Sequence, residues 1–188
     1  GSVSLMSTQF LEIEHKFVVP EAFDLETFAR ACRDLHPQVE KTVAVHDVYH
    51  VLAGRSDIIF RHRFDRELQQ LTLKTRGVDN EVRTEINLAL QDPVQEAGVS
   101  AFLSAIGPTE RFPIQKQIHV FEFADCEIVH YTAQYEQRTV SCVEFEAVGA
   151  PDTATALATL ERYEQALGFD AATRTSVNLF EMLVGPTT

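Results

Sequence analysis

The chain has 188 residues, and 45% of them are hydrophobic, which is enough for one domain with a buried core. Its formal net charge of −12 at pH 7 repels the phosphates of nucleic acids and anionic lipid surfaces. We therefore expect neither a nucleic acid nor a membrane among its partners.

Hydrophobic periodicity predicts eight strands and four helices. In chain order we expect a strand at 9–19, a helix at 23–35, strands at 39–52, 57–66, 69–76 and 81–90, a helix at 93–106, strands at 114–124, 126–136 and 138–148, and helices at 152–167 and 170–183. Residues Gly77-Val78-Asp79-Asn80 are the strongest hairpin signal. Runs of strands with few helices between them favour antiparallel pairing, and eight such strands predict a closed barrel or a sandwich.

Residues Gly1 to Leu5 look like an expression remnant ahead of a native start at Met6, so we expect a single domain over residues 6–188. No stretch approaches about 20 consecutive apolar residues, and no basic leader precedes an apolar run. Three cysteines without Cys-x-x-Cys spacing argue against a disulfide framework or a zinc site. Together these features predict a cytoplasmic protein with reduced thiols.

Charged residues recur at alternate positions of several predicted strands, and alternate residues share one face of a strand. Strand by strand, the groups are Glu12 and Glu14 with Lys16, Arg61 with Arg63, Lys74 with Arg76, Arg83 with Glu85, and Glu144 with Glu146. A single group of this kind is typical of a solvated strand face in any sandwich. Taken together, the groups segregate by sign, because two strands carry mainly carboxylates and three carry mainly cations.

Some of the opposite faces of these strands are as apolar as core faces, for example Leu71 and Leu73 beside Lys74. If the apolar faces pack beneath helices, the charged faces point into the barrel, where buried charges need partners. Paired carboxylates are hard oxygen ligands for Mg²⁺ or Mn²⁺, and arginine and lysine bind phosphate oxygens. The pattern therefore predicts a site for a metal-chelated triphosphate.

The charged motifs also follow one another in the order of a known family. Residues 12–16 read Glu-Ile-Glu-His-Lys and resemble its Glu-x-Glu-x-Lys signature near the N-terminus. The further matches are Asp47-Val48-Tyr49, Arg61-His62-Arg63, Lys74-Thr75-Arg76, Arg83-Thr84-Glu85, Glu144-Phe145-Glu146 and Arg174-Thr175-Ser176. Over residues 9–184 the chain thus resembles the CYTH family of triphosphate tunnel metalloenzymes, which includes class IV adenylate cyclases, thiamine triphosphatases and inorganic triphosphatases.

The resemblance implies an α+β, mainly β fold, in which eight antiparallel strands form a tunnel and helices pack outside. It implies that Mg²⁺ or Mn²⁺ is held by Glu12, Glu14, Glu144 and Glu146. It implies that the phosphates are bound by Lys16, Arg61, Arg63, Lys74 and Arg83, with Arg76, Lys116 and Arg174 as further candidates. In this interpretation Glu85 or Glu146 orients the attacking water.

Two features depart from the family's pattern. The metal-binding Asp that usually stands about a dozen residues before the late Glu pair is missing, and Lys116 is followed at i+2 by Ile118 where Lys-x-Arg is usual. Glu127 and His130 are candidates for a substitute ligand, although a histidine uninvolved in metal binding is the safer expectation. An Asp at Thr132 would restore the ligand if that side chain faces the lumen.

Our first functional hypothesis is metal-dependent hydrolysis of a small-molecule triphosphate, either inorganic or organic. The alternatives are a class IV-type adenylate cyclase, a non-catalytic binder of polyphosphate or nucleotide, and an ordinary β-sandwich with solvated charges. The sequence shows no adenine-reading motif, and no motif identifies an organic group that would lie at the mouth of the tunnel.

Overall fold

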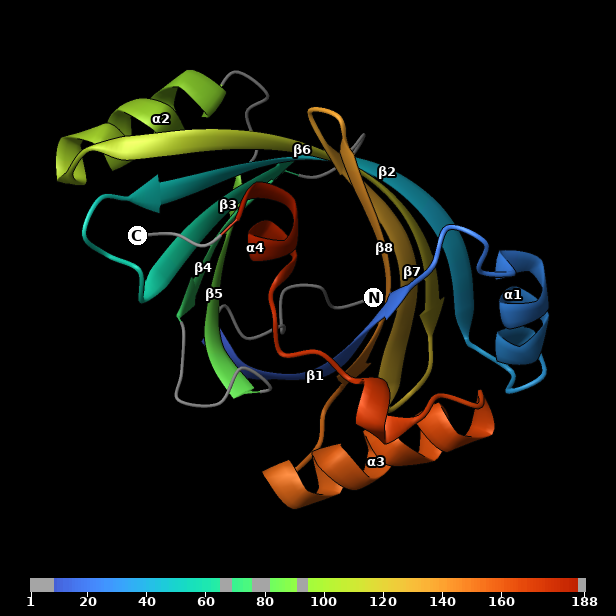
Figure 1. Ribbon diagram of the computed structural model, residues 1–188. Helices are drawn as coiled ribbons and strands as arrows, with labels where there is room; N and C mark the ends of the chain where they lie inside the picture. Colours follow the sequence, from blue (N-terminus) through green and yellow to red (C-terminus); the bar gives the residue numbers. More distant parts are fainter. Residues whose placement is uncertain (1–8, 65–68, 76–81, 91–94, 186–188) are drawn as a thin grey trace.

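The computed structural model describes residues 9–64, 69–75, 82–90 and 95–185 (Figure 1). The strands are β1 (Gln9–Val19), β2 (Val39–Leu52), β3 (Ile58–Phe64), β4 (Gln69–Thr75), β5 (Val82–Leu90), β6 (Thr109–Glu122), β7 (Cys126–Tyr135) and β8 (Arg138–Ala147). The helices are α1 (Leu25–Arg33), α2 (Gln95–Ile106), α3 (Thr153–Ala166) and α4 (Leu179–Val184), with one 3₁₀ turn, η2 (Ala171–Thr173), ahead of α4.

The eight strands close into one barrel in the order β1-β5-β4-β3-β2-β6-β7-β8. Every neighbouring pair is antiparallel, and β8 pairs with β1 to complete the ring. Closure removes the free strand edges, and alternation gives each strand one outward and one inward face. The predicted antiparallel barrel with helices packed outside is confirmed.

Helices α1 and α3 cover the outer faces of β1, β6, β7 and β8 (Figure 1). Phe17, Phe121 and Phe145 from these strands pack with Phe28 of α1 and Leu160 of α3. All five side chains are buried. This layer is the main hydrophobic core, and it lies outside the barrel, so the inward faces of these strands are free to carry charge.

Helix α2 covers the outer faces of β2, β3 and β4 in the same way. Its Val99 and Leu103 pack against Phe60 and Leu71, with Leu73 beside them. The apolar residues that alternate with Lys74 therefore face outward beneath a helix, and Lys74 faces the lumen.

Helix α4 packs across one end of the barrel and lies within the ring of strands when the barrel is viewed along its axis (Figure 1). Its Leu179, Phe180 and Leu183 are buried against Tyr49 of β2 and Ile114 of β6. The helix thus closes that end with apolar side chains.

The expected helix over 170–183 is wrong, because the chain is interrupted between η2 and α4. The backbone N–H of Thr175 donates to the carbonyl of Lys16 at 2.9 Å, so the segment pairs with β1 instead of coiling. The side chains of Asp170 and Asn178 each cap a separate helical segment. Each cap marks the start of a short helical segment. The apolar periodicity runs through both segments and therefore predicted one continuous helix.

Strand β6 begins five residues before the expected start at 114, because Pro113 does not break it. β7 pairs with β6 only from Gln115 onward, so Pro113 lies where β6 has β2 as its one neighbour. A proline is tolerated where no second strand needs its missing N–H. The other element boundaries agree within two residues over the described ranges, and the Gly77–Asn80 hairpin lies outside them.

Cys32, Cys126 and Cys142 are buried and free, as the sequence predicted. Among the helices of the described ranges, none is long and apolar enough to cross a membrane.

Candidate functional site

The barrel encloses a cavity of about 1210 Å³, and each of the eight strands contributes at least one charged side chain to its lining, with Glu127 as the contribution of β7. Eleven of the residues that the sequence singled out line it: Glu12, Glu14, Lys16, Arg61, Arg63, Lys74, Arg83, Glu85, Lys116, Glu144 and Glu146. They reach the cavity because each occupies an inward position of its strand.

Three carboxylates converge at one place in this cavity. One oxygen from each of Glu12, Glu14 and Glu146 lies within 4.8 Å of the others. Glu14 and Glu146 are direct partners in the β1–β8 register, and Glu12 follows Glu14 on the same strand face. No hydrogen bond or ion pair engages the Glu146 carboxylate within the described part of the chain. This donor set suits a hard divalent cation such as Mg²⁺ or Mn²⁺.

The electrostatics of this group also favour a cation. Burial and the nearby Glu12 carboxylate raise the pKa of Glu14 to about 7. Burial and the surrounding carboxylates raise the pKa of Glu146 well above its usual value. Burial opposes ionisation of Glu12 too, but Lys74 and Arg83 outweigh it and lower the pKa of Glu12 to about 2. The three carboxyl groups therefore resist full ionisation unless a positive ion joins them.

Two cations border the carboxylate group. Lys74 Nζ lies 3.2 Å from both carboxylate oxygens of Glu12 and 3.2 Å from Glu85 Oε1. Arg83 Nη2 donates to Glu14 Oε1 at 2.9 Å and lies 3.4 Å from Glu12 Oε1. These contacts position the carboxylates and bring two positive side chains to the edge of the candidate metal site.

A second charged cluster is centred on Asp47, which is completely buried. Arg63 donates to both of its carboxylate oxygens at 2.8 Å. Lys116 Nζ lies 2.6 Å from Asp47 Oδ2 and donates to the Tyr49 hydroxyl at 2.8 Å. Burial opposes the ionisation of Asp47, yet Lys116 and Arg63 hold its pKa far below the usual value. One carboxylate thus fixes two cations that face the cavity.

Arg61 lies on the same strand face as Arg63 and lines the cavity. Its Nε is buried without a hydrogen-bond partner, and within the described ranges no carboxylate forms an ion pair with it. The side chain as a whole is half-buried and feels the charge of Asp47, but a guanidinium nitrogen kept from water without an acceptor is unfavourable. Arg61 is therefore the side chain of the cavity whose surroundings most clearly require an anion.

Glu144 is engaged by the protein and does not belong to the converging carboxylates. Lys16 Nζ lies 3.5 Å from Glu144 Oε1, and the Tyr131 hydroxyl donates to the same oxygen at 2.6 Å. Burial opposes its ionisation, but Lys16 and Tyr131 lower the pKa of Glu144. Tyr131 was not predicted as a site residue, although its alternation with Glu127 along β7 places both on one strand face.

Glu85 is held by the side-chain amide of Asn87, which was also not predicted as a site residue. Asn87 Nδ2 donates to Glu85 Oε2 at 3.1 Å, and the Thr72 hydroxyl donates to Asn87 Oδ1 at 2.6 Å. The signal was available, because Asn87 follows Glu85 at i+2 and so shares its face of β5.

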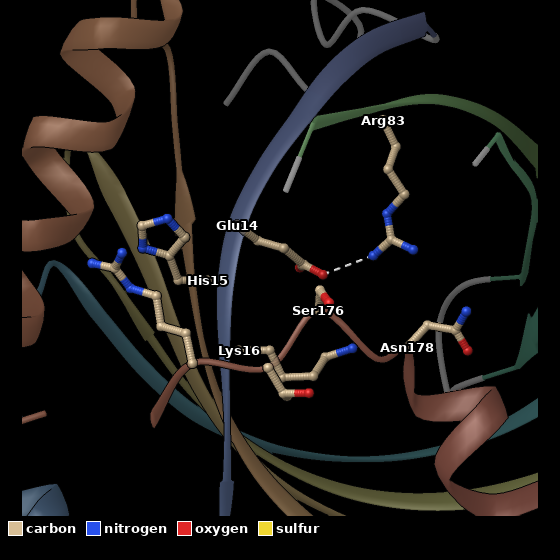
Figure 2. Close-up of a pocket in the computed structure, with 8 residues that line it drawn as sticks. Glu14, His15, Lys16, Arg83, Ser176 and Asn178 are labelled. Atoms are coloured by element: carbon tan, nitrogen blue, oxygen red, sulfur yellow. Dashed lines mark hydrogen bonds and ion pairs between the residues drawn. The ribbon is translucent and has the colours of Figure 1, made fainter. Parts of the chain in front are cut away.

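The segment between η2 and α4 adds polar groups beside β1. Ser176 and Asn178 line a small hollow together with Glu14, Lys16 and Arg83, and Figure 2 shows these side chains on the same side of the strand. Lys16 Nζ also lies 3.5 Å from the carbonyl oxygen of Val177. The pairing of this segment with β1 therefore sets the end of α4 against the charged wall.

Arg174 borders the small hollow beside β1 but does not line the barrel cavity. Its Nη2 donates to Glu164 Oε2 of α3 at 2.5 Å, and Glu164 Oε1 lies 2.6 Å from His15 Nδ1. Figure 2 shows His15 on the opposite side of β1 from Glu14. Arg174 therefore joins the C-terminal segment to α3 on the outside of the barrel. Arg76 lies outside the described residues.

Thr132 faces away from the lumen. An Asp at this position was expected to restore a metal ligand only if the side chain faced the lumen. The Thr132 hydroxyl lies 2.9 Å from the Ser141 hydroxyl, on the outer side of β7 and β8. The inward residues of β7 that line the cavity are Glu127, Val129 and Tyr131. An Asp at 132 would therefore not reach the carboxylate group, because alternation turns it outward.

The two substitute ligands considered from the sequence lie on opposite faces of β7. His130 faces outward and stacks on Phe23, with 5.6 Å between ring centroids. Glu127 lines the cavity and is the register partner of Glu146. Histidine is thus part of the outer packing, and the carboxylate is on the side of the candidate metal site.

Solved structures of other proteins share this barrel fold. A PH1012 protein from Pyrococcus horikoshii OT3 superposes with a TM-score of 0.73 at 16% identity, covering 92% of this chain and 99% of that chain. A candidate adenylate cyclase from Bacillus halodurans gives 0.68 at 16% identity, covering 95% and 100%. The capping-enzyme triphosphatase of Mimivirus gives 0.53 at 11% identity, covering 84% and 90%.

These likenesses establish the barrel fold, because the identities are too low to carry more. Among curated proteins, no sequence matches this chain. The family comparison is more specific, since the CYTH domain matches residues 11–174 and so includes both the carboxylate group and the cations around it. The chain belongs to the CYTH domain family.

Proposed function

We propose that this protein hydrolyses a triphosphate with the help of Mg²⁺ or Mn²⁺ inside the barrel. The observation that carries the proposal is that three converging carboxylates and a set of cations face one cavity. A metal-chelated triphosphate is the ligand class that needs both. The Nε of Arg61, which has no hydrogen-bond partner in the described ranges, supports an anion in the same cavity.

Glu12, Glu14 and Glu146 would hold the divalent ion, because their oxygens already converge. Such an ion, when bound, neutralises phosphate charge and polarises a coordinated oxygen. Glu127 lies beside Glu146 and would extend the carboxylate wall.

The cations would bind the phosphate oxygens from the other side. Arg61 has no competing partner within the described ranges, and Arg63 and Lys116 are held in place by Asp47. Arginine binds phosphate through its bidentate fork and lysine as a point charge. In the reaction, water oxygen bonds to the terminal phosphorus and the bridging oxygen leaves with the electron pair. These cations would stabilise the charge on that leaving group.

Glu85 and Glu146 are the candidates for orienting the attacking water. Glu85 is fixed by Asn87 and Lys74, so its carboxylate has a defined direction. Glu146 has no protein partner in the described ranges. It could orient the water and bind the metal together only if one carboxylate oxygen holds the metal and the other contacts the water.

The test is phosphate release from tripolyphosphate and from ATP, with Mg²⁺, with Mn²⁺ and with excess chelator. Hydrolysis should require the metal, and Arg61→Gln should lower kcat/KM by roughly 10–100-fold for a lost charged hydrogen-bonding group. The matched control is Arg30→Gln, because Arg30 is an exposed arginine of α1 whose side chain is far from the cavity.

Analysis of the ATP products separates the remaining alternatives. If the products of ATP are a cyclic nucleotide and diphosphate, the protein is a cyclase and not a hydrolase. If tripolyphosphate binds in a metal-dependent way but no product forms, the protein is a non-catalytic binding protein. Activity that survives exhaustive chelation would contradict the metal role.

A further inference from the structure

One part of the cavity wall is apolar. It consists of Val43 and Val45 of β2, Ile118 and Val120 of β6, and Val129 of β7, all of which line the cavity. Val43 pairs with Ile118, and Val120 pairs with Val129, in adjacent strand registers. The five side chains therefore form one continuous surface, here called the apolar wall.

The apolar wall adjoins the charged site directly. Lys116 precedes Ile118 by two residues on the same strand face, and Val129 is the register partner of Glu144. Toward the other end of the barrel the wall stops at charged residues, where Lys41 Nζ lies 3.4 Å from Glu122 Oε1. A ligand bound by the cations would thus have apolar surface beside it before the charged rim begins.

The protein covers other inward apolar residues but leaves this wall bordering the cavity. At the opposite end, Leu179 and Phe180 of α4 bury Ile114 and Tyr49. Within the apolar wall, Val43, Ile118 and Val129 are half-buried and supply the surface that borders the cavity, whereas Val45 and Val120 are buried beside them. Apolar surface that faces an open cavity favours an apolar ligand group, because burying it removes both surfaces from water.

The size of the cavity supports the same conclusion. Its volume of about 1210 Å³ exceeds the roughly 300–1,000 Å³ of pockets that hold drug-sized ligands. A bare triphosphate would contact the charged half and leave the apolar wall in contact with water.

We infer that the substrate is a triphosphate ester whose apolar or aromatic organic group lies on the apolar wall, and not inorganic triphosphate. This inference rests on the proposed function for the position of the phosphates. The wall contains no hydrogen-bonding side chain, so it selects for apolar surface and not for a particular pattern of polar atoms.

Equilibrium binding of three non-hydrolysable anions in the presence of Mn²⁺ tests the inference. The probes are methylene-bridged triphosphate, its methyl ester and its phenyl ester. The two esters carry the same charge, so their difference reports the organic group alone. We expect the phenyl ester to bind about tenfold more tightly than the methyl ester, from the apolar area that the ring buries.

Conservative variants locate the effect. Val43→Thr/Val129→Thr keeps the side-chain shapes but adds hydroxyl groups to the wall, and it should reduce the preference for the phenyl ester several-fold while leaving the affinity for the methyl ester unchanged. Val18→Thr is the control, because Val18 is an exposed strand valine that does not line the cavity.

Equal affinities for the phenyl and methyl esters in the wild-type protein would overturn the inference, and so would an unchanged preference in the double variant. These outcomes are separate from failure of the proposed function. Phosphate release from tripolyphosphate with no ester preference would leave the hydrolase standing and remove the organic subsite. A strong preference for the phenyl ester without any hydrolysis would support the organic subsite and contradict the proposed hydrolase.

Discussion

At the scale of single residues, Asp47 shows how the protein holds like charges together. Its carboxylate lies between Arg63 and Lys116, and both cations face the cavity that we assign to phosphates. In the ligand-free protein Asp47 supplies the negative charge that a phosphate would supply after binding. Asp47 is therefore a positioning residue and does not need to touch the substrate.

Asp47→Asn should destabilise the ligand-free protein by about 3–5 kcal/mol, because it leaves the buried Lys116 and the half-buried Arg63 without their shared carboxylate. The same variant should gain more stability from tripolyphosphate than the wild type does, because the anion then replaces the missing charge. Urea unfolding with and without tripolyphosphate measures both effects. Asp57→Asn is the control, since Asp57 makes the same two-pronged contact with Arg55 on the exposed surface, where such a pair contributes less than about 1 kcal/mol. Wild-type stability in Asp47→Asn would contradict the assignment.

The two late glutamates should differ in their effect on metal binding. Glu146→Gln removes a carboxylate that converges with Glu12 and Glu14, and it should weaken Mn²⁺ affinity by at least about tenfold. Glu144→Gln should weaken it less, because that side chain is engaged by Lys16 and Tyr131.

Titration calorimetry with Mn²⁺ measures this order, with the exposed Glu110→Gln as the control. If Glu144→Gln proves the more damaging of the two, the metal lies nearer to Glu144 than we propose.

At the scale of elements, the layer beneath α2 contains two buried histidines, His50 of β2 and His62 of β3. Burial, with Arg111 and His62 nearby, lowers the pKa of His50 to about 4. Burial also lowers the pKa of His62. This layer therefore packs best when both imidazoles are neutral.

The lowered pKa makes stability depend on pH in a defined direction. The contribution of His50 is fully present above its unfolded pKa of about 6.5 and is lost as the pH falls toward 4, with a magnitude on the order of 3 kcal/mol. His50→Leu should therefore flatten the fall in unfolding free energy between pH 6.5 and 4. The control His36→Asn removes an exposed histidine and should leave the fall unchanged. An equally steep fall in His50→Leu would show that other groups cause it.

Helix α4 depends on Phe180 to close its end of the barrel. The Phe180 ring lies 4.9 Å from Phe112 and 5.7 Å from Tyr49, measured between centroids, and the side chain is buried. Phe180→Ala should cost about 3–5 kcal/mol in urea unfolding. Phe102→Ala, at an exposed phenylalanine of α2, should stay within about 0.5 kcal/mol of the wild type. A small effect of Phe180→Ala would mean that α4 contributes little to stability.

At the scale of the whole molecule, the protein combines a net charge of −12 with cations gathered in its lumen. An anion that enters the lumen binds the folded state and should stabilise it by mass action, about 2.7 kcal/mol at a concentration 100 times its dissociation constant. Tripolyphosphate should therefore raise Tm more than chloride does at equal ionic strength, as thermal unfolding measures directly. Equal shifts would count against a specific site in the lumen.

The sequence by itself determined the barrel and most of its lining. Alternation placed Glu12, Lys74 and Arg61 on inward strand faces, and the apolar residues between them required cover by helices. This inference succeeds because the side-chain period of a strand is local and depends only on neighbouring residues. The order of the charged motifs also indicated the CYTH family, which the match over residues 11–174 confirms.

Only the tertiary structure decided which charges meet. The capture of Glu144 by Tyr131, the outward turn of Thr132 and the pairing of Arg174 with Glu164 each depend on register between strands or on packing of distant segments. The break between η2 and α4 also depends on a distant segment, because the backbone N–H of Thr175 donates to the carbonyl of Lys16 in β1 and not to a helical carbonyl. Local periodicity carries no information on such contacts, since they join residues far apart in the chain and are chosen by the closure of the barrel.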